Sequence, residues 1–201
     1  MRDLAQLRKK LARYLSEPVA KILSRTPVTP NSLSLTGFLL TVVAAVLIVM
    51  GHFLLAGLVV LLAGFFDMLD GALARYTGRS SRFGGALDSM LDRLSEAALL
   101  LGILLWHLNL DGEPLLTVLI FLVLVFSPLV SYLRARAEGL GIECRVGLFT
   151  RPERMLVLVL GLMLKQIFIA LLIIAILSFI TSGERLFYIW KQTRTDLTGG
   201  K

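Results

Sequence analysis

Residues 53–75 read FLLAGLVVLLAGFFDMLDGALAR, an apolar run that ends in two aspartates, a glycine and an arginine. The apolar part approaches the roughly 20 residues that a helix needs to cross a bilayer. Asp67 and Asp70 are three positions apart, so a helix places them on one face. The stretch therefore predicts a membrane-spanning helix with an acidic pair near its C-terminal end.

The rest of the chain repeats this apolar character. Further apolar runs cover about 33–50, 86–108 and 114–133. Hydrophobic residues make up 56% of the 201 residues and charged residues 17%, which leaves too little polar surface to cover a soluble globule. We predict an all-α integral membrane protein. A net charge of +7 could indicate nucleic acid, but in so apolar a chain it favours loops that lie against anionic lipid.

The two ends of the chain do not follow the simple pattern of one apolar run per helix. Residues 1–25 interleave basic residues with leucines at a spacing of three to four, which predicts an amphipathic helix in the membrane interface. Residues 155–180 could form one long helix or a hairpin divided at Lys165-Gln166. Twenty of the 21 Lys and Arg residues lie in 1–31, 70–93, 134–154 and the tail from Arg185. The positive-inside rule places all of them on one side only if 155–180 crosses twice.

The apolar runs and the distribution of basic residues predict one membrane domain over residues 1–201. It would contain six transmembrane helices over about residues 32–190, with both termini in the cytoplasm.

Asp88 and Asp92 form a second acidic pair, four positions apart at the start of the next apolar run. A short loop at 75–84 would make the two helices antiparallel neighbours and bring both pairs to one end. Four carboxylates there would repel one another unless cations lay between them. Oxygen ligands of this kind suit Mg²⁺ or Mn²⁺, and two such ions can hold a diphosphate.

Two residues beside the aspartates suit a phosphate ligand. Gly71 would permit close approach of a ligand or helix, and Arg75 is placed to meet phosphate. The alternative is that the aspartates are helix ends paired with Arg75, Arg82 and Arg93. The matching spacing of four aspartates around a glycine favours the metal site.

The spacing Asp70-Gly71-x₂-Ala74-Arg75-x₈-Gly84-x₃-Asp88-x₃-Asp92, with Asp67 upstream, resembles the complete signature of the CDP-alcohol phosphotransferase family. The resemblance implies a six-helix membrane enzyme, usually a homodimer. It would transfer a substituted phosphate from a CDP-linked lipid to an alcohol and release CMP. By the same resemblance, two metal ions would bind Asp67, Asp70, Asp88 and Asp92, and Asp92 would also act as the base. The positions expected to touch the cytidine nucleotide are Asn31, Ser34, Gly71, Arg75 and Ser81.

A second arginine-rich set suggests the acceptor. It comprises Arg134, Arg136, Arg151, Arg154 and Arg185. Arginine binds phosphate through two parallel hydrogen bonds, so the set predicts a phosphorylated polyol acceptor. Ordinary positive-inside loop charge is the alternative for each of them.

Residues 131–138, SYLRARAE, and 151–154, RPER, are similar to phosphatidylinositol-phosphate synthases of actinobacteria and their archaeal relatives. That similarity implies inositol 1-phosphate as the acceptor. Arg134 stands where lysine is common in that group, and Asn31 stands where some members have aspartate.

Two other functions compete with this prediction. Glycerol 3-phosphate as acceptor would make the product phosphatidylglycerol phosphate. A cation transporter would also carry intramembrane acidic residues, but on several helices and through the depth of the membrane. Here the acidic residues cluster at one end of one helical hairpin. We therefore expect a multi-pass enzyme of the plasma membrane with a cytoplasmic active site, acting on lipid and not on nucleic acid.

Overall fold

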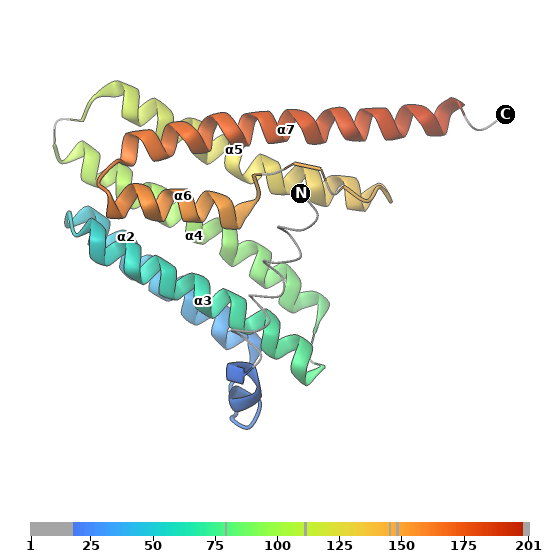
Figure 1. Ribbon diagram of the computed structural model, residues 1–201, viewed down its shortest axis with the longest axis horizontal. Coiled ribbons are helices and arrows are strands. Elements are labelled where there is room, and N and C mark those ends of the chain that lie inside the picture. Colours follow the sequence, from blue (N-terminus) through green and yellow to red (C-terminus); the bar gives the residue numbers. More distant parts are fainter. Residues whose placement is uncertain (1–17, 79, 111, 145, 148, 199–201) are drawn as a thin grey trace. The chain divides into compact units, whose positions relative to one another are not determined.

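The computed structural model describes residues 18–198 except 79, 111, 145 and 148. The described residues contain helices and connecting segments and no strand, which confirms the all-α class (Figure 1). The chain divides into two compact units, an N-terminal unit of residues 1–102 and a C-terminal unit of residues 103–201. The long helices are α2 Pro30–Val49, α3 Phe53–Thr77, α4 Arg82–Leu108, α5 Pro114–Gly139, α6 Arg151–Met163 and α7 Ile167–Thr198.

The start of α2 is defined by local capping. Thr29 is the N-cap, and its hydroxyl accepts a hydrogen bond from the Ser32 N–H at 3.2 Å. The Ser32 hydroxyl in turn accepts one from the Thr29 N–H at 3.1 Å, and Pro30 follows at the first helical position. This reciprocal pairing satisfies two backbone donors that the helix itself leaves open.

In the N-terminal unit, α2 and α3 lie side by side over much of their length (Figure 1). A buried cluster of Leu33, Leu69 and Leu73 joins the start of α2 to the last third of α3, with Val19, Leu23, Val28 and Phe66 packed against it. Helix α3 ends at Gly78, whose φ of 65° is the left-handed conformation usual after a helix. Helix α4 then begins at Arg82. Asp67 and Asp70 therefore lie in the last part of α3, and Asp88 and Asp92 lie in the first part of α4.

Close packing also joins α4 to α2. A Cβ added at Gly102 of α4 would lie 2.7 Å from the Ala45 carbonyl oxygen and 3.1 Å from the Ala45 Cα. Both atoms belong to the helix backbone and cannot move aside independently. Glycine is therefore required at position 102 for α2 and α4 to approach this closely.

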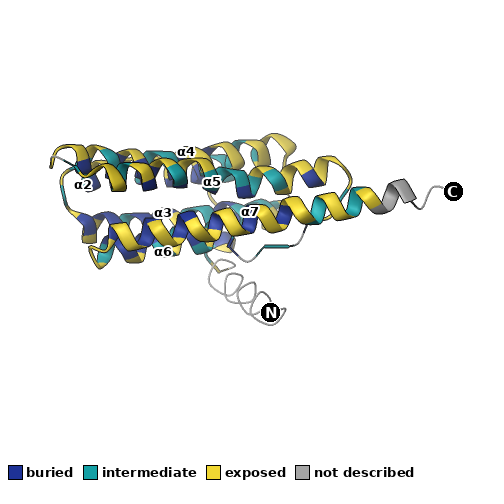
Figure 2. Ribbon diagram, turned by 90° about the horizontal axis from the view of Figure 1, so that it is seen from above, coloured by how far each residue is buried: buried dark blue, intermediate teal, exposed yellow. Residues whose placement is uncertain are grey.

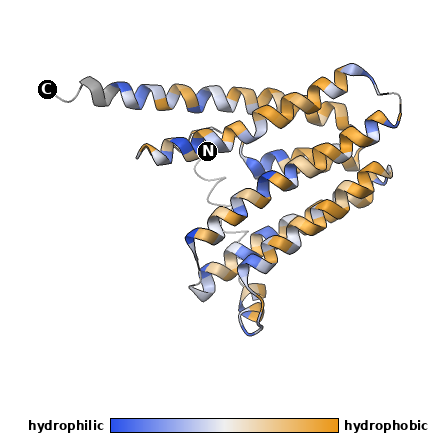
Figure 3. Cartoon of the chain, turned by 180° about the vertical axis from the view of Figure 1, so that it is seen from behind, coloured by the Kyte–Doolittle hydropathy of each residue, from blue (hydrophilic) through white to orange (hydrophobic). Residues whose placement is uncertain are grey.

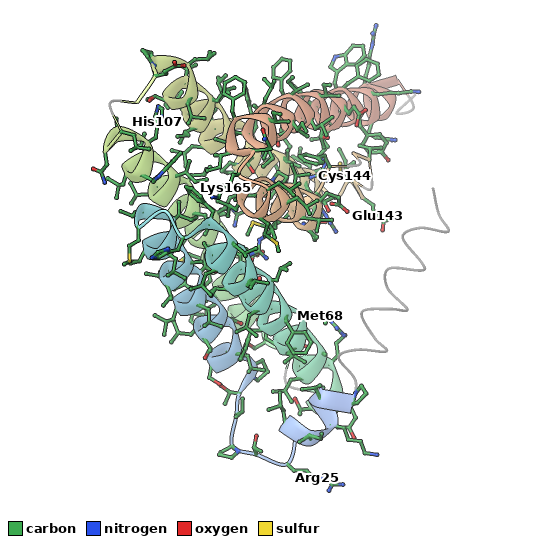
Figure 4. The ribbon with its side chains drawn as sticks, turned by 60° about the vertical axis from the view of Figure 1, so that its left-hand side comes forward. Arg25, Met68, His107, Glu143, Cys144 and Lys165 are labelled. Atoms are coloured by element: carbon green, nitrogen blue, oxygen red, sulfur yellow. The ribbon has the colours of Figure 1, made fainter. Side chains whose placement is uncertain are left out.

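In the C-terminal unit, α6 and α7 form the predicted hairpin. Helix α6 ends before Leu164, and Lys165 adopts a positive φ of 57° in the turn (Figure 4). A Cβ added at Gly161 would lie 2.3 Å from the Ala170 Cβ, so the two helices touch directly after the turn. The alternative of one continuous helix over residues 155–180 is wrong.

Helices α5 and α7 also pack together in this unit. The rings of Phe126 and Phe179 meet edge to face, with centroids 5.1 Å apart, an arrangement that aromatic pairs favour. The buried face of α7 is apolar at its start, with Leu171 and Ile174. It becomes polar further along, where Ser178, Thr181, Ser182 and Arg185 are buried.

Within the described residues, four helices are long and apolar enough to cross a membrane, namely α2, α3, α5 and α7. In α5, only 28% of the most apolar window is buried although its mean hydropathy is 2.5, so most of its apolar side chains face outward. Figure 2 shows the exposed faces of these helices, and Figure 3 shows that α7 is apolar along its first part and more polar toward its end. Exposing such large apolar faces to water is unfavourable, whereas contact with lipid is not.

The remaining two predicted spans are helical but depart from simple membrane helices. Helix α4 carries Asp88, Asp92, Arg93 and Glu96. Helix α6 has 13 residues and is therefore about 20 Å long, shorter than the roughly 30 Å hydrocarbon core. Six membrane crossings thus stay a prediction. The predicted interfacial helix falls mostly on residues 1–17, which lie outside the described residues, and residues 18–23 are helical.

Candidate active site

One pocket of about 200 Å³ lies in the N-terminal unit. Its walls come from the start of α2, the C-terminal part of α3, the connector 78–81 and the start of α4. The lining residues are Pro30, Asn31, Ser34, Asp70, Gly71, Ala74, Arg75, Ser80, Ser81, Gly84, Gly85 and Asp88. The structure thus brings together all five residues predicted to touch the nucleotide, and two of the four predicted metal-binding aspartates.

The wall at the start of α4 depends on two side chains and a glycine. Ser81 precedes the helix, and its hydroxyl accepts a hydrogen bond from the Gly84 N–H at 2.9 Å, as an N-cap residue does. A Cβ added at Gly84 would lie 3.0 Å from the Ser81 Oγ and 3.1 Å from the Asn31 Oδ1. Gly84 therefore lets Asn31 of α2 and Ser81 of the connector meet at the helix start.

Asp70 is the most enclosed of the four aspartates. Its side chain is buried and accepts a hydrogen bond from the Ser34 hydroxyl of α2. The same hydroxyl lies 3.2 Å from the Pro30 carbonyl oxygen. Asp67 and Asp88 are both near enough to interact electrostatically with Asp70. Two of the other carboxylates therefore influence Asp70, and Ser34 orients it.

Asp67 also turns toward α2. A Cβ added at Gly37 would lie 3.0 Å from the Asp67 Oδ1. Asp67 and Asp92 lie outside the pocket lining, and Asp92 is about one helical turn beyond Asp88 on α4. Among the described residues, no three His, Cys, Asp or Glu side chains are gathered into a metal centre. Coordination by the four aspartates stays a prediction.

Arg75 lies over the glycine of the same helix. A Cβ added at Gly71 would be 3.2 Å from the Arg75 Nη1, so the guanidinium folds back along α3 toward the pocket that both residues line. Position 71 without a side chain leaves room for this arrangement. A cationic group at the pocket wall suits a diphosphate.

The predicted acceptor arginines lie in the C-terminal unit. Arg134 and Arg154 are both near enough to interact electrostatically with Arg185. Arg154 and Arg185 are buried, whereas Arg134 and Arg136 are exposed and Arg151 is intermediate. Arg134 pairs with Glu138 at 2.9 Å across one turn of α5. Three like charges gathered in one unit are a candidate anion site.

Arg185 has a second role that its sequence position did not indicate. Its Nε donates a hydrogen bond to the Val146 carbonyl at 3.0 Å and its Nη1 donates one to the Val130 carbonyl at 2.5 Å. The side chain therefore ties α7 to α5 and to Val146, which follows Glu143 and Cys144 (both labelled in Figure 4) along the chain. Tyr188 adds a longer contact, with its hydroxyl 3.4 Å from the Glu143 carbonyl oxygen.

Sequence reasoning missed several pocket residues. Pro30, Ser80 and Gly85 line the pocket because they adjoin predicted residues along the chain. Gly37 could have been found from the sequence, since a glycine inside an otherwise regular apolar helix usually has a packing reason.

The helical fold and a pocket lined by Asp70, Asp88 and Arg75 define a membrane enzyme that acts on a phosphorylated substrate. The chain belongs to the CDP-alcohol phosphatidyltransferase family, whose model matches residues 27–186. This membership confirms the resemblance seen in the aspartate spacing and identifies the chain as a multi-pass membrane transferase of phospholipid biosynthesis.

Two curated relatives show how far the similarity extends. The chain is 38% identical over 190 residues to an archaetidylinositol phosphate synthase of Pyrococcus horikoshii, over 94% of this chain and 97% of that protein. It is 35% identical over 194 residues to a phosphatidylinositol phosphate synthase of Mycobacterium marinum, over 91% of this chain and 83% of that protein.

Two crystal structures of the Mycobacterium tuberculosis phosphatidylinositol phosphate synthase are also similar. The one with CDP-DAG bound superposes with a TM-score of 0.80 at 32% identity, covering 88% of this chain and 94% of that chain. The one in complex with manganese and citrate gives 0.79 at 33% identity, covering 87% and 88%.

Proposed function

We propose that this enzyme transfers a phosphatidyl or archaetidyl group from a CDP-linked lipid to inositol 1-phosphate and releases CMP. The observation that carries the proposal is the pocket in which Asn31, Ser34, Gly71, Arg75 and Ser81 meet Asp70 and Asp88. Relatives at 35–38% identity with this activity in their names support the same acceptor. The related structures with CDP-DAG and with manganese support the donor and the use of a divalent ion.

The four aspartates would hold two Mg²⁺ or Mn²⁺ ions. Their donor atoms are all carboxylate oxygens, which these hard cations prefer, and Asp67, Asp70 and Asp88 already interact electrostatically. When bound, the ions would neutralise the charge of the diphosphate and of the departing CMP. Ser34 would keep the Asp70 carboxylate oriented through its hydrogen bond, as residues behind metal ligands commonly do.

The protein's own residues would do the remaining work of the transfer. Asn31 and Ser81 would hold the cytidine nucleotide at the start of α4, and Arg75 would pair with its phosphate. Asp92 would take the proton from the acceptor hydroxyl. The hydroxyl oxygen would then bond to the phosphorus that carries the lipid, and the bond from that phosphorus to the bridging oxygen would break. CMP leaves with the electron pair of that bond.

The acceptor phosphate would bind the arginines of the C-terminal unit, namely Arg134, Arg136, Arg151, Arg154 and Arg185. The electrostatic proximity of Arg134, Arg154 and Arg185 supports this assignment. Arg185 would contribute through the guanidinium donors that its two backbone hydrogen bonds do not use.

The membrane arrangement is part of the proposal. Helices α2 to α7 would make six crossings, with the 1–25 segment in the interface and the active site and both termini in the cytoplasm. The distribution of basic residues supports this orientation. We further propose a homodimer in the plasma membrane, as the family resemblance implies.

An acceptor panel tests the function. Purified protein would receive CDP-diacylglycerol, Mn²⁺ or Mg²⁺, and one radiolabelled acceptor at a time: inositol 1-phosphate, glycerol 3-phosphate or free inositol. We expect label in lipid only with inositol 1-phosphate. Incorporation of glycerol phosphate with none of inositol phosphate would overturn the assignment, and equal use of free inositol would contradict phosphate recognition by the arginines.

Asp92 can be tested in the same assay. Asp92→Asn should abolish CMP release while the protein remains folded, because the amide cannot accept the proton. Normal CMP release by this variant would exclude Asp92 as the base.

A further inference from the structure

We infer that Gly37 of α2 is a positioning residue for the reaction, because its missing side chain makes the space that the Asp67 carboxylate occupies. The inference rests on the proposed function in one respect, namely that Asp67 is a metal ligand. The contact itself lies within the N-terminal unit, between two helices that pack side by side (Figure 1).

The space at Gly37 is enclosed by three atoms of α3. A Cβ there would lie 3.0 Å from the Asp67 Oδ1, 3.3 Å from the Ala63 carbonyl oxygen and 3.6 Å from the Phe66 Cβ. Gly37 is buried, and the backbone fixes the direction of a Cβ, so an added methyl group could not turn away from these atoms. It would have to displace one of these neighbours or push α2 away from α3.

The three neighbours differ in how easily they move. The Ala63 carbonyl is part of the α3 backbone, and the Phe66 Cβ is attached directly to it. The Asp67 carboxylate is the end of a side chain with two rotatable bonds, and it makes the shortest of the three contacts. The displacement therefore falls first on Asp67, which interacts electrostatically with Asp70.

Backbone conformation does not explain a glycine here. Gly37 is in the middle of α2, and its φ is not among the positive values of the described residues. A glycine in a helix interior costs about 0.5–1 kcal/mol relative to alanine. Close approach of the Asp67 carboxylate is the physical reason for accepting that cost.

Gly37→Ala tests the inference, with Mn²⁺ binding to the detergent-purified protein measured by isothermal titration calorimetry. Losing the support of a metal ligand typically weakens binding about 10- to 100-fold, and we expect a rise in Kd of at least about tenfold. Gly64→Ala is the matched control. Gly64 is a helical glycine of α3 with nothing within 4 Å of an added Cβ, so its Kd should equal that of the unsubstituted protein.

A packing control separates helix displacement from metal positioning. Gly102→Ala would also push α4 and α2 apart, since its Cβ would lie 2.7 Å from the Ala45 carbonyl oxygen of α2. No carboxylate is among the atoms of that contact. We expect a lower unfolding temperature in Gly102→Ala and less than about a threefold change in its Mn²⁺ Kd.

A double substitution keeps the inference testable if Gly37→Ala folds poorly. Removing the carboxylate with Asp67→Ala makes room for the new methyl group. Because alanine also favours a helix interior over glycine, Gly37→Ala in the Asp67→Ala background should unfold at the same temperature as Asp67→Ala alone or at a higher one. A loss of stability that persists in that background would show that the methyl group clashes with the α3 backbone, and would overturn the inference.

The remaining outcomes separate this inference from the proposed function. An unchanged Mn²⁺ Kd in Gly37→Ala, alongside binding by the unsubstituted protein, overturns only the role of Gly37. Absence of Mn²⁺ binding by the unsubstituted protein overturns the proposed metal site and this inference with it.

Discussion

Replacing Arg185 with alanine should loosen the C-terminal unit. Arg185 is 4% exposed, and its guanidinium donates to the carbonyls of Val130 and Val146. These two bonds join α7 to Val130 of α5 and to Val146, which lies between α5 and α6 in the sequence. The substitution removes both bonds and leaves a cavity where the side chain was.

The two hydrogen bonds set the magnitude of the loss. A hydrogen bond to a charged group contributes about 1.5–3 kcal/mol, so losing both should lower the free energy of unfolding by about 3–6 kcal/mol. For a chain of this size that corresponds to a fall of about 6–24 °C in the apparent unfolding temperature.

Arg134→Ala is the matched control. Its pair with Glu138 has side chains 57% and 54% exposed, and exposed pairs of this kind contribute about 0.3–0.5 kcal/mol. The unfolding temperature of Arg134→Ala should therefore change little. Its KM for the acceptor should rise, because an arginine proposed to meet the acceptor phosphate is lost.

Thermal unfolding of the detergent-purified variants, followed by circular dichroism, gives the comparison directly. A fall of less than about 2 °C for Arg185→Ala would mean that the two backbone bonds do not hold the unit together, contrary to this prediction. An equal fall in both variants would also refute it, because Arg134 makes no buried backbone bond of this kind in the described contacts.

Three further predictions concern the N-terminal unit. Ser34→Ala removes the hydrogen bond to Asp70 and should weaken Mn²⁺ binding about tenfold. Calorimetric titration of the variant and the unsubstituted protein measures this, and an equal Kd would contradict it. Gly84→Ala places a methyl group 3.0 Å from the Ser81 Oγ and 3.1 Å from the Asn31 Oδ1, so the KM for the CDP-lipid should rise several-fold. Gly85→Ala is the control, because a Cβ there meets nothing within 4 Å. Treatment with a chelator should abolish transfer, and Mn²⁺ or Mg²⁺ should restore it; activity that survives exhaustive chelation would exclude the metal site.

Several features of the fold followed from local sequence. The apolar runs predicted the helices, and the Thr29–Ser32 capping pair defines where α2 begins. The hairpin at Lys165 followed from charge distribution, because a single crossing would have placed basic residues on both sides. Whether α6 crosses the membrane was harder to predict, since its 13 residues are few for a crossing. Apolar periodicity does not define how much of it lies in the membrane.

The candidate site was predictable to the extent that its chemistry is local. Spacings of three and four residues place Asp67 with Asp70, and Asp88 with Asp92, on single helix faces. These spacings sufficed to identify the family. They could not show that Asp70 binds the Ser34 hydroxyl, or that Arg185 binds two backbone carbonyls, because those partners lie 36, 39 and 55 residues away along the chain.

The helical membrane class, the acidic pairs and the family could be predicted from the sequence, because hydrophobic length and helical spacing are properties of short segments. Which residues pack against Asp67 and Asp70 followed from the three-dimensional packing. The close approach of α2 and α3 places Gly37 against Asp67 and Ser34 against Asp70. Such contacts depend on the packing register of two helices, which no single segment encodes.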